Sequence, residues 1–246
     1  MIAIKKGQPP QCLVERQKEA IERGLNANDA YGLLIKSERD IVVDRLMSEQ
    51  GHLCAYCMRR IPDERVPRED YADIPPVTIE HWFPRKPTDG TEIGQGLDYN
   101  NFLAVCSGSK RKRKKGQHRA GNGELTCDAK RKGSYSQLTL NPCDPDTLSS
   151  LYYSDEGRLC SNDPTIMDDI DVKLNLNCCK DMLNLPEIRE RVLSGLQSMI
   201  PDDENAALAY CQRALSGFEN ESDPKTEYVG ILIWWLRKYI SSCKTE

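Results

Sequence analysis

The chain has 246 residues, enough for one large domain or two small ones, and 39% of them are hydrophobic. With a mean hydropathy of −0.62, we expect a modest core beneath much solvated surface. No segment approaches the roughly 18 consecutive apolar residues of a membrane span, and no signal peptide is visible. These features exclude a membrane-spanning class and predict a soluble, cytoplasmic protein.

Charge is distributed unevenly along the chain. The net charge is −4, yet ten Lys or Arg stand against two acids between Lys110 and Lys132. Dense Lys and Arg favour binding to a phosphate backbone because counterions are released on contact. This basic segment is therefore expected to meet nucleic acid, and a solvated charge run is the alternative.

The eleven cysteines would suggest disulfides in a secreted protein, but their number is odd and the chain is long. Cys54-x-x-Cys57, followed by Cys106 and Cys127, offers the four thiolates that a closed tetrahedral zinc site requires. The basic segment is inserted between the last two. We assign this zinc a structural role, since the region has little apolar material of its own. Free thiols are expected at Cys12, Cys143, Cys160, Cys178, Cys179, Cys211 and Cys243.

Two helices are predicted in the amino-terminal part of the chain. Residues 11–23 and 37–50 place apolar side chains at three- and four-residue spacing, and a glycine follows each segment. The knuckle that contains Cys54 and Cys57 comes next. We then expect a short strand from Met58 to Ile61 and a loop over 62–76.

The central part of the chain predicts two short strands and a helical turn. Thr78–Phe83 is β-branched and aromatic-flanked, and the following proline ends it. After a loop over 84–96, Phe102–Val105 forms a second, apolar strand. A helical turn begins near Asp128, so the order of elements is a ββ-metal-α arrangement with the basic segment inserted before its helix.

The carboxy-terminal part predicts a hairpin and then helices. Leu151–Tyr153 and Arg158–Cys160 are separated by turn residues and are typical of a hairpin. Helical patterns follow over 168–183, 186–199, 203–217 and 225–242. The last contains GILIWWLRKYI, whose apolar residues cover too much of the circumference to face water, so it packs in the core or against a partner, with the core favoured.

A carboxylate and a histidine stand side by side on the predicted central strand. Glu80 can hold a hard divalent cation, and a neutral imidazole at His81 can take a proton from water. Asn101 and Asp128 can converge on this pair through the knuckle. Of the other two histidines, His52 is assigned to a turn and His118 to a phosphate contact.

Five motifs in this order resemble one known family: CAYC, TIEHWFP, LDYNNFLAVC, TCDAKRKG and NPCDPD. They are similar to the HNH endonucleases, in particular the PtuB-type HNH subunit of Septu and retron-associated antiphage systems. The specific motifs cover about residues 54–145, and the likeness is weaker over the amino-terminal segment and the helical tail. The resemblance implies an α+β protein with three regions: a helical segment (1–51), a zinc-bound HNH core (52–145) and a hairpin plus helical region (146–246).

The resemblance also implies a role for each residue of the site. His81 corresponds to the general base, and Glu80 and Asp128 correspond to ligands of one catalytic Mg²⁺ or Mn²⁺. Asn101 stands at the position of the middle asparagine, with its neighbour Asn100 as the rival. The last motif residue is usually His or Asn, so His118 competes with Asp128 for that place. Contacts to nucleic acid are expected from Lys110, Arg111, Lys112, Arg113, Lys114, Lys115, His118, Lys130, Arg131 and Lys132.

The function that the resemblance implies is metal-dependent hydrolysis of phosphodiester bonds in DNA or RNA. The implied partner is an ATPase subunit of the PtuA type, and a retron reverse transcriptase with its msDNA is a further candidate. A zinc-ribbon adaptor that binds nucleic acid without cleaving it is the alternative from another class. A third hypothesis is a structural subunit whose helical tail carries the partner contact.

Overall fold

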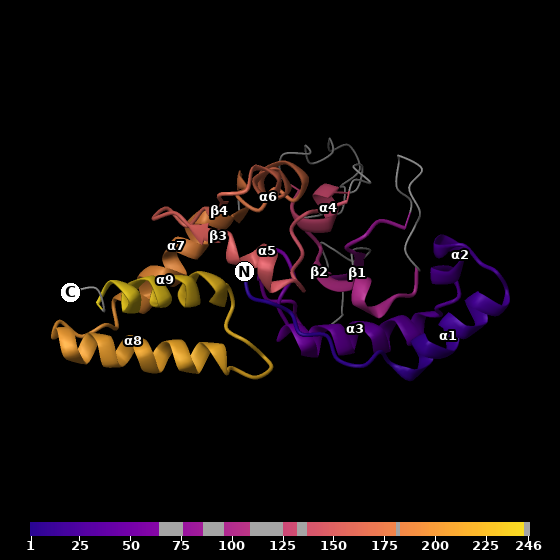
Figure 1. Cartoon of the computed structure of the whole chain (residues 1–246), viewed down its shortest axis with the longest axis horizontal. Helices are drawn as coiled ribbons and strands as arrows, with labels where there is room; N and C mark the ends of the chain where they lie inside the picture. Colours follow the sequence, from indigo (N-terminus) through magenta and orange to yellow (C-terminus); the bar gives the residue numbers. More distant parts are fainter. Residues whose placement is uncertain (64–75, 86–95, 109–124, 132–136, 181–182, 244–246) are drawn as a thin grey trace, which may run out of the picture.

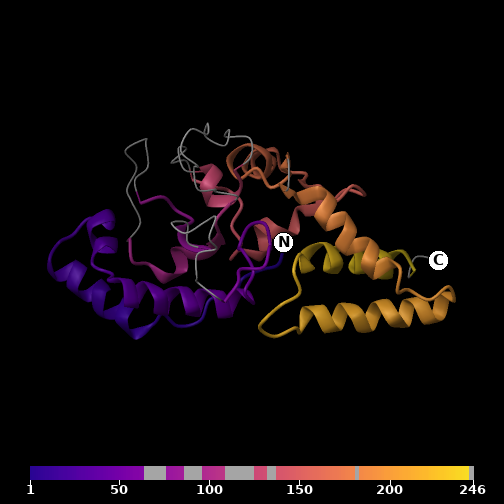
Figure 2. The same ribbon diagram turned by 180° about the vertical axis from the view of Figure 1, so that it is seen from behind.

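The computed structural model describes residues 1–63, 76–85, 96–108, 125–131, 137–180 and 183–243. The molecule is elongated, with the amino-terminal helices at one end and the last helices of the chain at the other (Figure 1). Two central strands lie between these ends, and the view from behind shows the same order (Figure 2). This mixed arrangement of helices and small sheets agrees with the predicted α+β class.

Three helices build the amino-terminal end: α1 (Gln11–Glu22), α2 (Ala27–Gly32) and α3 (Lys36–Gln50). The first and the third confirm the two predicted helices, and α2 was not predicted. The Asn26 side chain begins α2 by accepting the backbone N–H groups of Asn28 and Asp29, both at 3.0 Å. At the end of α3, Gly51 adopts a left-handed φ of 64°, which costs glycine little.

The middle of the molecule is an antiparallel strand pair followed by a short helix: β1 (Val77–His81), η2 (Tyr99–Asn101), β2 (Phe102–Cys106) and α4 (Cys127–Arg131). In the strand pair Glu80 stands opposite Leu103 and His81 opposite Phe102. Gln50 of α3 fixes β2 in place, because its side chain donates to the carbonyl oxygen of Ala104 at 2.8 Å and accepts from its N–H at 2.9 Å. The order strand, strand, helix is the predicted one.

The strand predicted from Met58 to Ile61 does not form, and a single bridge joins Leu53 to Arg60 instead. The reason is the tight turn of the knuckle. The N–H of Met58 bonds to the carbonyl of Cys54 at 3.0 Å, and Met58 takes a left-handed φ of 62°. These backbone groups are used within the turn, so no extended strand follows.

The remainder of the chain is formed by small sheets and helices: α5 (Pro145–Ser149), β3 (Leu151–Tyr153), β4 (Leu159–Ser161), α6 (Pro164–Asp168), the π-helix η3 (Asp169–Lys173), β5 (Cys179–Lys180), β6 (Leu183–Asn184), α7 (Leu185–Gln197), α8 (Glu204–Glu219) and α9 (Val229–Ser242). The predicted hairpin and the last three predicted helices are confirmed. Helix α9 packs in the core, with Ile231, Leu232 and Leu236 each at most 3% exposed.

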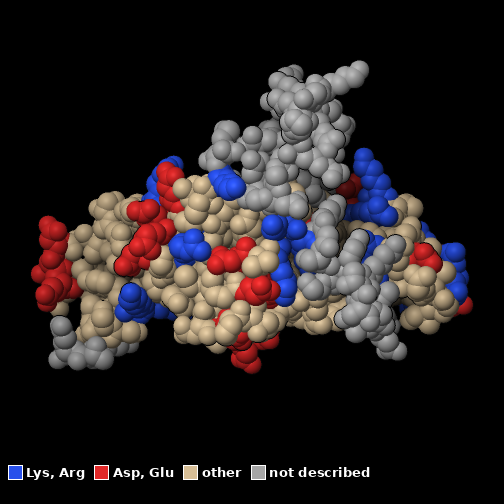
Figure 3. All heavy atoms as spheres, turned by 90° about the horizontal axis from the view of Figure 1, so that it is seen from above, with Lys and Arg blue, Asp and Glu red and all other residues tan. Residues whose placement is uncertain are grey.

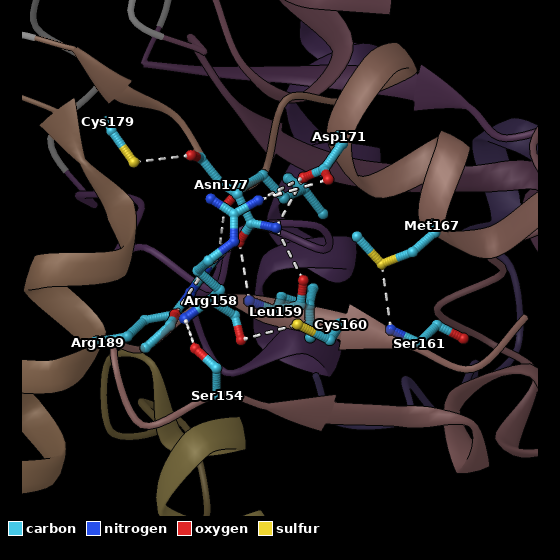
Figure 4. A network of polar contacts seen from close by, with 12 residues as sticks. Ser154, Arg158, Leu159, Cys160, Ser161, Met167, Asp171, Asn177, Cys179 and Arg189 are labelled. Carbon is cyan, nitrogen blue, oxygen red and sulfur yellow. Dashed lines mark hydrogen bonds and ion pairs between the residues drawn. The ribbon is translucent and has the colours of Figure 1, made fainter. Parts of the chain in front are cut away.

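The helix predicted over 168–183 forms only as far as Lys173, in α6 and the π-helix η3. The described residues after it are not helical, because polar side chains there bond to neighbouring elements (Figure 4). The Asn177 side chain accepts from the N–H of Leu159 at 2.8 Å and donates to its carbonyl at 2.8 Å. It also donates to Asp171 at 2.8 Å. Asn175 has a left-handed φ of 50°, which ends helical geometry just before this point.

One hydrophobic cluster joins all three predicted regions, since it contains Ile4, Phe102, Leu159 and Leu236. Among the described helices, none has the length and apolar character that crossing a bilayer demands. The boundaries at residues 51 and 145 stay predictions.

Candidate metal centre and candidate active site

Four buried cysteines come together beside the strand pair. Cys54, Cys57, Cys106 and Cys127 are each at most 5% exposed, and their sulfur atoms all lie within 4.8 Å of one another. Three of the Sγ–Sγ distances are 3.7, 3.8 and 3.9 Å. A tetrahedron with Zn–S bonds of about 2.3 Å places its sulfurs about 3.8 Å apart. The cluster therefore has the size and the ligand set to hold a metal such as zinc.

Different parts of the chain hold these cysteines in place. Cys54 and Cys57 lie in the knuckle, Cys106 ends β2, and Cys127 begins α4 with a left-handed φ of 54°. The backbone N–H of Cys127 donates to the carbonyl of Leu174 at 2.8 Å. The position of the fourth sulfur thus depends on a segment nearly fifty residues further along the chain.

The four thiols share protons unequally. The hydrogen bond with the Cys106 thiol is the largest effect that lowers the pKa of Cys57 well below its usual value. The pKa of Cys127 is raised, first by its hydrogen bond with Cys106. One sulfur therefore ionises ahead of its neighbours, and a thiolate is the form that binds metal. No other group of three or more metal-binding side chains occurs in the described part of the chain.

The other seven cysteines lie outside this cluster and form no disulfide with one another among the described residues. Cys178 and Cys211 are buried, and Cys179 and Cys243 are exposed. Burial is common for cysteine, which behaves as a small apolar side chain.

Glu80 lies in a buried group of charges at the strand pair. It is 6% exposed, and one of its oxygens receives the Arg131 guanidinium at 2.5 Å. Burial, reinforced by the nearby Asp128 carboxylate, raises the pKa of Glu80 to about 8, against the opposite effect of Arg131. Two carboxylates this close together repel one another, which adds to the effect of burial on Glu80.

Arg131 was expected to contact phosphate, but the structure places it elsewhere. The side chain is buried, 6% exposed, and it crosses from α4 to the end of β1. Besides Glu80, it donates to the carbonyl oxygens of His81 and Trp82, at 3.2 and 2.8 Å. In this arrangement the guanidinium fixes the strand end and donates to Glu80, so it is not offered to a ligand in solvent.

The His81 imidazole is enclosed, with 7% exposure, between two aromatic rings. Tyr31 and Phe102 each approach it edge to face with ring centroids 4.8 Å away. Its Nε2 lies 3.0 Å from the Gly96 carbonyl, which can only accept, so Nε2 carries the hydrogen. Burial lowers the pKa of His81 to about 4. The ring is therefore neutral at physiological pH, and Nδ1 holds the lone pair.

Asn101 closes the turn that follows β1. It is buried, and its side chain accepts from the N–H of Phe83 at 2.6 Å and donates to the carbonyl of Phe83 at 2.9 Å. Its neighbour Asn100 is exposed. Of the two asparagines, Asn101 is the one placed to hold the segment after His81 in a fixed shape.

Sequence reasoning missed two neighbours of the His81 ring, Tyr31 and Gly96. Helix α2 brings Tyr31 against the imidazole and also packs Ala27 against Gly96, where a side chain would overlap the Ala27 carbonyl oxygen. The signal that was available is Asn26, a good helix cap, followed at the third position by Asp29. Nothing in the sequence connects that short helix with position 81.

The remaining predicted contacts are outside this group of residues. Lys130 is partly buried on α4. His52 lies in the turn before the knuckle, as predicted, where its ring contacts Asp223 and, at 2.7 Å, Asp63. Most of the basic segment falls outside the described residues: Lys110, Arg111, Lys112, Arg113, Lys114, Lys115, His118 and Lys132.

Comparison with known proteins adds no name to this site, because no family model and no curated protein matches the sequence.

Proposed function

We propose that the chain is a metal-dependent nuclease of the HNH type. The observation that carries the proposal is the state of His81: a neutral imidazole, fixed through Nε2, next to Glu80 in the sequence and within the field of Asp128. A base prepared in this way can accept a proton from an attacking water through Nδ1. The strand, strand, helix order and the four-cysteine cluster support the same assignment.

Glu80 and Asp128 fit the ligand set of a hard divalent cation. Magnesium is commonly held by one or two carboxylates together with substrate phosphates. A bound Mg²⁺ or Mn²⁺ would supply charge stabilisation to the pentacoordinate phosphorus and to the leaving oxygen. The Arg131 guanidinium contacts the Glu80 carboxyl group, so it has to move when Glu80 binds a cation.

For the four-cysteine cluster we propose structural zinc. All four ligands are protein sulfurs, which leaves no open position for a substrate or a water. The thiolates would join the knuckle, β2 and α4, and so hold the candidate catalytic strand against α4.

The partners proposed are nucleic acid, through the basic segment, and an ATPase subunit as in Septu and retron-associated defence systems. The segment between 109 and 124 carries the densest positive charge of the sequence, which supports a phosphate backbone as the ligand. The ATPase rests on the motif resemblance alone.

A non-catalytic adaptor is the second candidate, and one observation favours it. Glu80 is already paired with Arg131, and His81 is 7% exposed, which is the expected state of a residue pair that stabilises the fold. An adaptor of this kind would bind nucleic acid and never cleave it.

The two candidates are separated by cleavage assays on plasmid and on transfer RNA, with Mg²⁺ or without added divalent cation. We compare the wild-type chain, His81→Ala and Arg237→Ala, which alters an exposed residue of α9. If the chain is a nuclease, wild type and Arg237→Ala both cleave the substrate. His81→Ala then loses at least about a hundredfold in cleavage rate. Equal activity of wild type and His81→Ala, or none even with the ATPase subunit added, leaves the adaptor as the function.

A further inference from the structure

Two arginines each lie over the ring of Tyr31, next to the candidate base. The guanidinium carbon of Arg85, just after β1, lies 4.2 Å from the ring centroid, and that of Arg39, in α3, lies 5.1 Å from it. The same ring touches the His81 imidazole edge to face. Residues from three elements thus place two positive charges beside His81.

In the described part of the chain neither of these guanidinium groups pairs with a carboxylate. Among the described residues Arg85 makes one weak polar contact, at 3.5 Å to the side-chain oxygen of Asn28. By contrast Arg16, Arg45 and Arg131 all form ion pairs. Arg85 is partly buried, and burial, with a smaller effect of the nearby Arg39 charge, lowers its pKa, whereas Glu80 and Asp128 act in the opposite sense. An anion bound at the two arginines would relieve the cost of burial and the repulsion.

The aromatic platform favours a ligand with oxygen acceptors. A guanidinium that lies over a ring gains cation–π energy and still directs its N–H groups outward in the plane of the fork. That fork matches the paired oxygens of a phosphate. The capped helix α2 fixes Tyr31, so the platform does not need to form when the ligand arrives.

Charge on the surface at this end of the molecule is mixed. Figure 3 shows Lys and Arg atoms together with some Asp and Glu atoms at the end formed by α1, α2 and α3, and residues 11–50 carry six Lys or Arg against eight Asp or Glu. Any attraction for an anion is therefore local to Arg39 and Arg85 and is not a property of the whole end.

We propose that Arg39 and Arg85, held by the Tyr31 ring, form a binding site for a backbone phosphate of nucleic acid beside His81. The inference rests on the proposed nuclease function for its ligand. It gives the substrate a second anchor, distinct from the basic segment. The phosphate held here would be a neighbour of the one that is hydrolysed.

The test measures binding separately from cleavage. Fluorescence anisotropy follows a short end-labelled duplex DNA and an RNA of the same sequence, in buffer without added divalent cation. The double variant Arg39→Ala/Arg85→Ala is compared with Arg23→Ala/Arg237→Ala, which removes the same charge from two exposed, carboxylate-paired arginines. We expect roughly tenfold weaker binding and a salt slope reduced by about two for the first pair, and less than twofold change for the second.

Variants at position 31 test the platform itself. Tyr31→Phe keeps the ring and should bind as wild type does, whereas Tyr31→Leu removes it and should lose at least about threefold in affinity. Thermal unfolding of each variant shows whether it is folded. Arg39→Lys/Arg85→Lys keeps the charge without the planar fork, so a partial loss is expected.

Unchanged affinity and salt slope in the folded Arg39→Ala/Arg85→Ala variant, on both DNA and RNA, would overturn the phosphate site. If wild type never cleaves but this variant still loses binding, the nuclease fails and the site stands. If wild type cleaves and the double variant binds and cleaves equally well, the nuclease stands and the site does not.

Discussion

At the scale of single residues, His81 combines properties that sequence alone could not assign. The motif indicated a histidine beside a carboxylate, and the surrounding side chains determine its protonation. Two aromatic edges and the Gly96 carbonyl enclose the ring, and burial lowers its pKa to about 4. It is therefore unprotonated at every pH at which the protein is expected to work.

This low pKa has a consequence for stability. Between pH 6.5 and 4 the unfolded chain binds a proton at position 81 and the folded chain does not, so stability is full above pH 6.5 and falls as the pH drops. The shift corresponds to roughly 3 kcal/mol. In urea unfolding, the advantage of wild type over His81→Gln should shrink by about 2 kcal/mol from pH 7 to pH 4.5, because the full loss is reached only below the folded pKa. Gln keeps a donor for Gly96, and a pH-independent difference between the two proteins would contradict the assignment.

Residues of the candidate site could be predicted where they belong to one short sequence motif. Glu80, His81 and Asn101 were identified because they flank one strand and its partner. Arg131 was misread, since a sequence of positive charges does not reveal which side chain turns inward to meet Glu80. The pair over Tyr31 was not visible at all, because its members come from three separate segments.

At the scale of elements, the short helix α2 matters more than its length suggests. Ala27 packs so closely on Gly96 that no β-carbon fits there, and the Gly96 carbonyl holds the His81 ring. The helix therefore shapes the candidate base from both sides, through Ala27 and through Tyr31.

Gly96→Ala tests this contact. The added methyl group would push the segment away from α2, and we expect a loss of roughly 2 kcal/mol in unfolding free energy together with a weaker candidate base. Gly195→Ala is the matched control, because Gly195 lies inside α7 with open space around it. That change should stabilise the protein by about 0.5 to 1 kcal/mol. A Gly96→Ala protein as stable as wild type would show that the close packing has no energetic role.

Helices were predicted correctly where apolar residues recur at regular spacing. The prediction failed where side chains, and not backbone groups, supply the hydrogen bonds. The helices α1, α3, α7, α8 and α9 follow from periodicity. Around Asn177, by contrast, amide groups bond across to β4, which no periodic pattern indicates. The short segment between α1 and α3 was too small for a periodicity test.

At the scale of the whole molecule, distant parts of the chain hold the four-cysteine cluster. The Leu174 carbonyl receives the N–H of Cys127 at 2.8 Å. From the last third of the chain, Lys225 bonds to the carbonyl of Gly51 and Tyr228 to that of Met58, both at 3.0 Å. The carboxy-terminal region therefore supports the four-cysteine cluster.

A chain that ends at Thr165 should consequently lose the metal. Metal analysis of the full chain is expected to find about one zinc, and the shortened chain and Cys54→Ser far less, with reduced solubility. Cys243→Ser, at an exposed cysteine, should keep the full amount. A shortened chain that retained one zinc and unfolded cooperatively would show that the region before residue 165 is self-sufficient.

Because the position of Cys127 depends on the Leu174 carbonyl, the cluster can assemble only after this part of the chain has been synthesised. Synthesis delivers all four sulfurs, the imidazole and both carboxylates long before Leu174 and Tyr228 emerge. A nascent or prematurely terminated polypeptide would thus contain each chemical group of the proposed nuclease without the backbone that assembles them. If the proposed nuclease function holds, only finished copies would be able to hydrolyse nucleic acid.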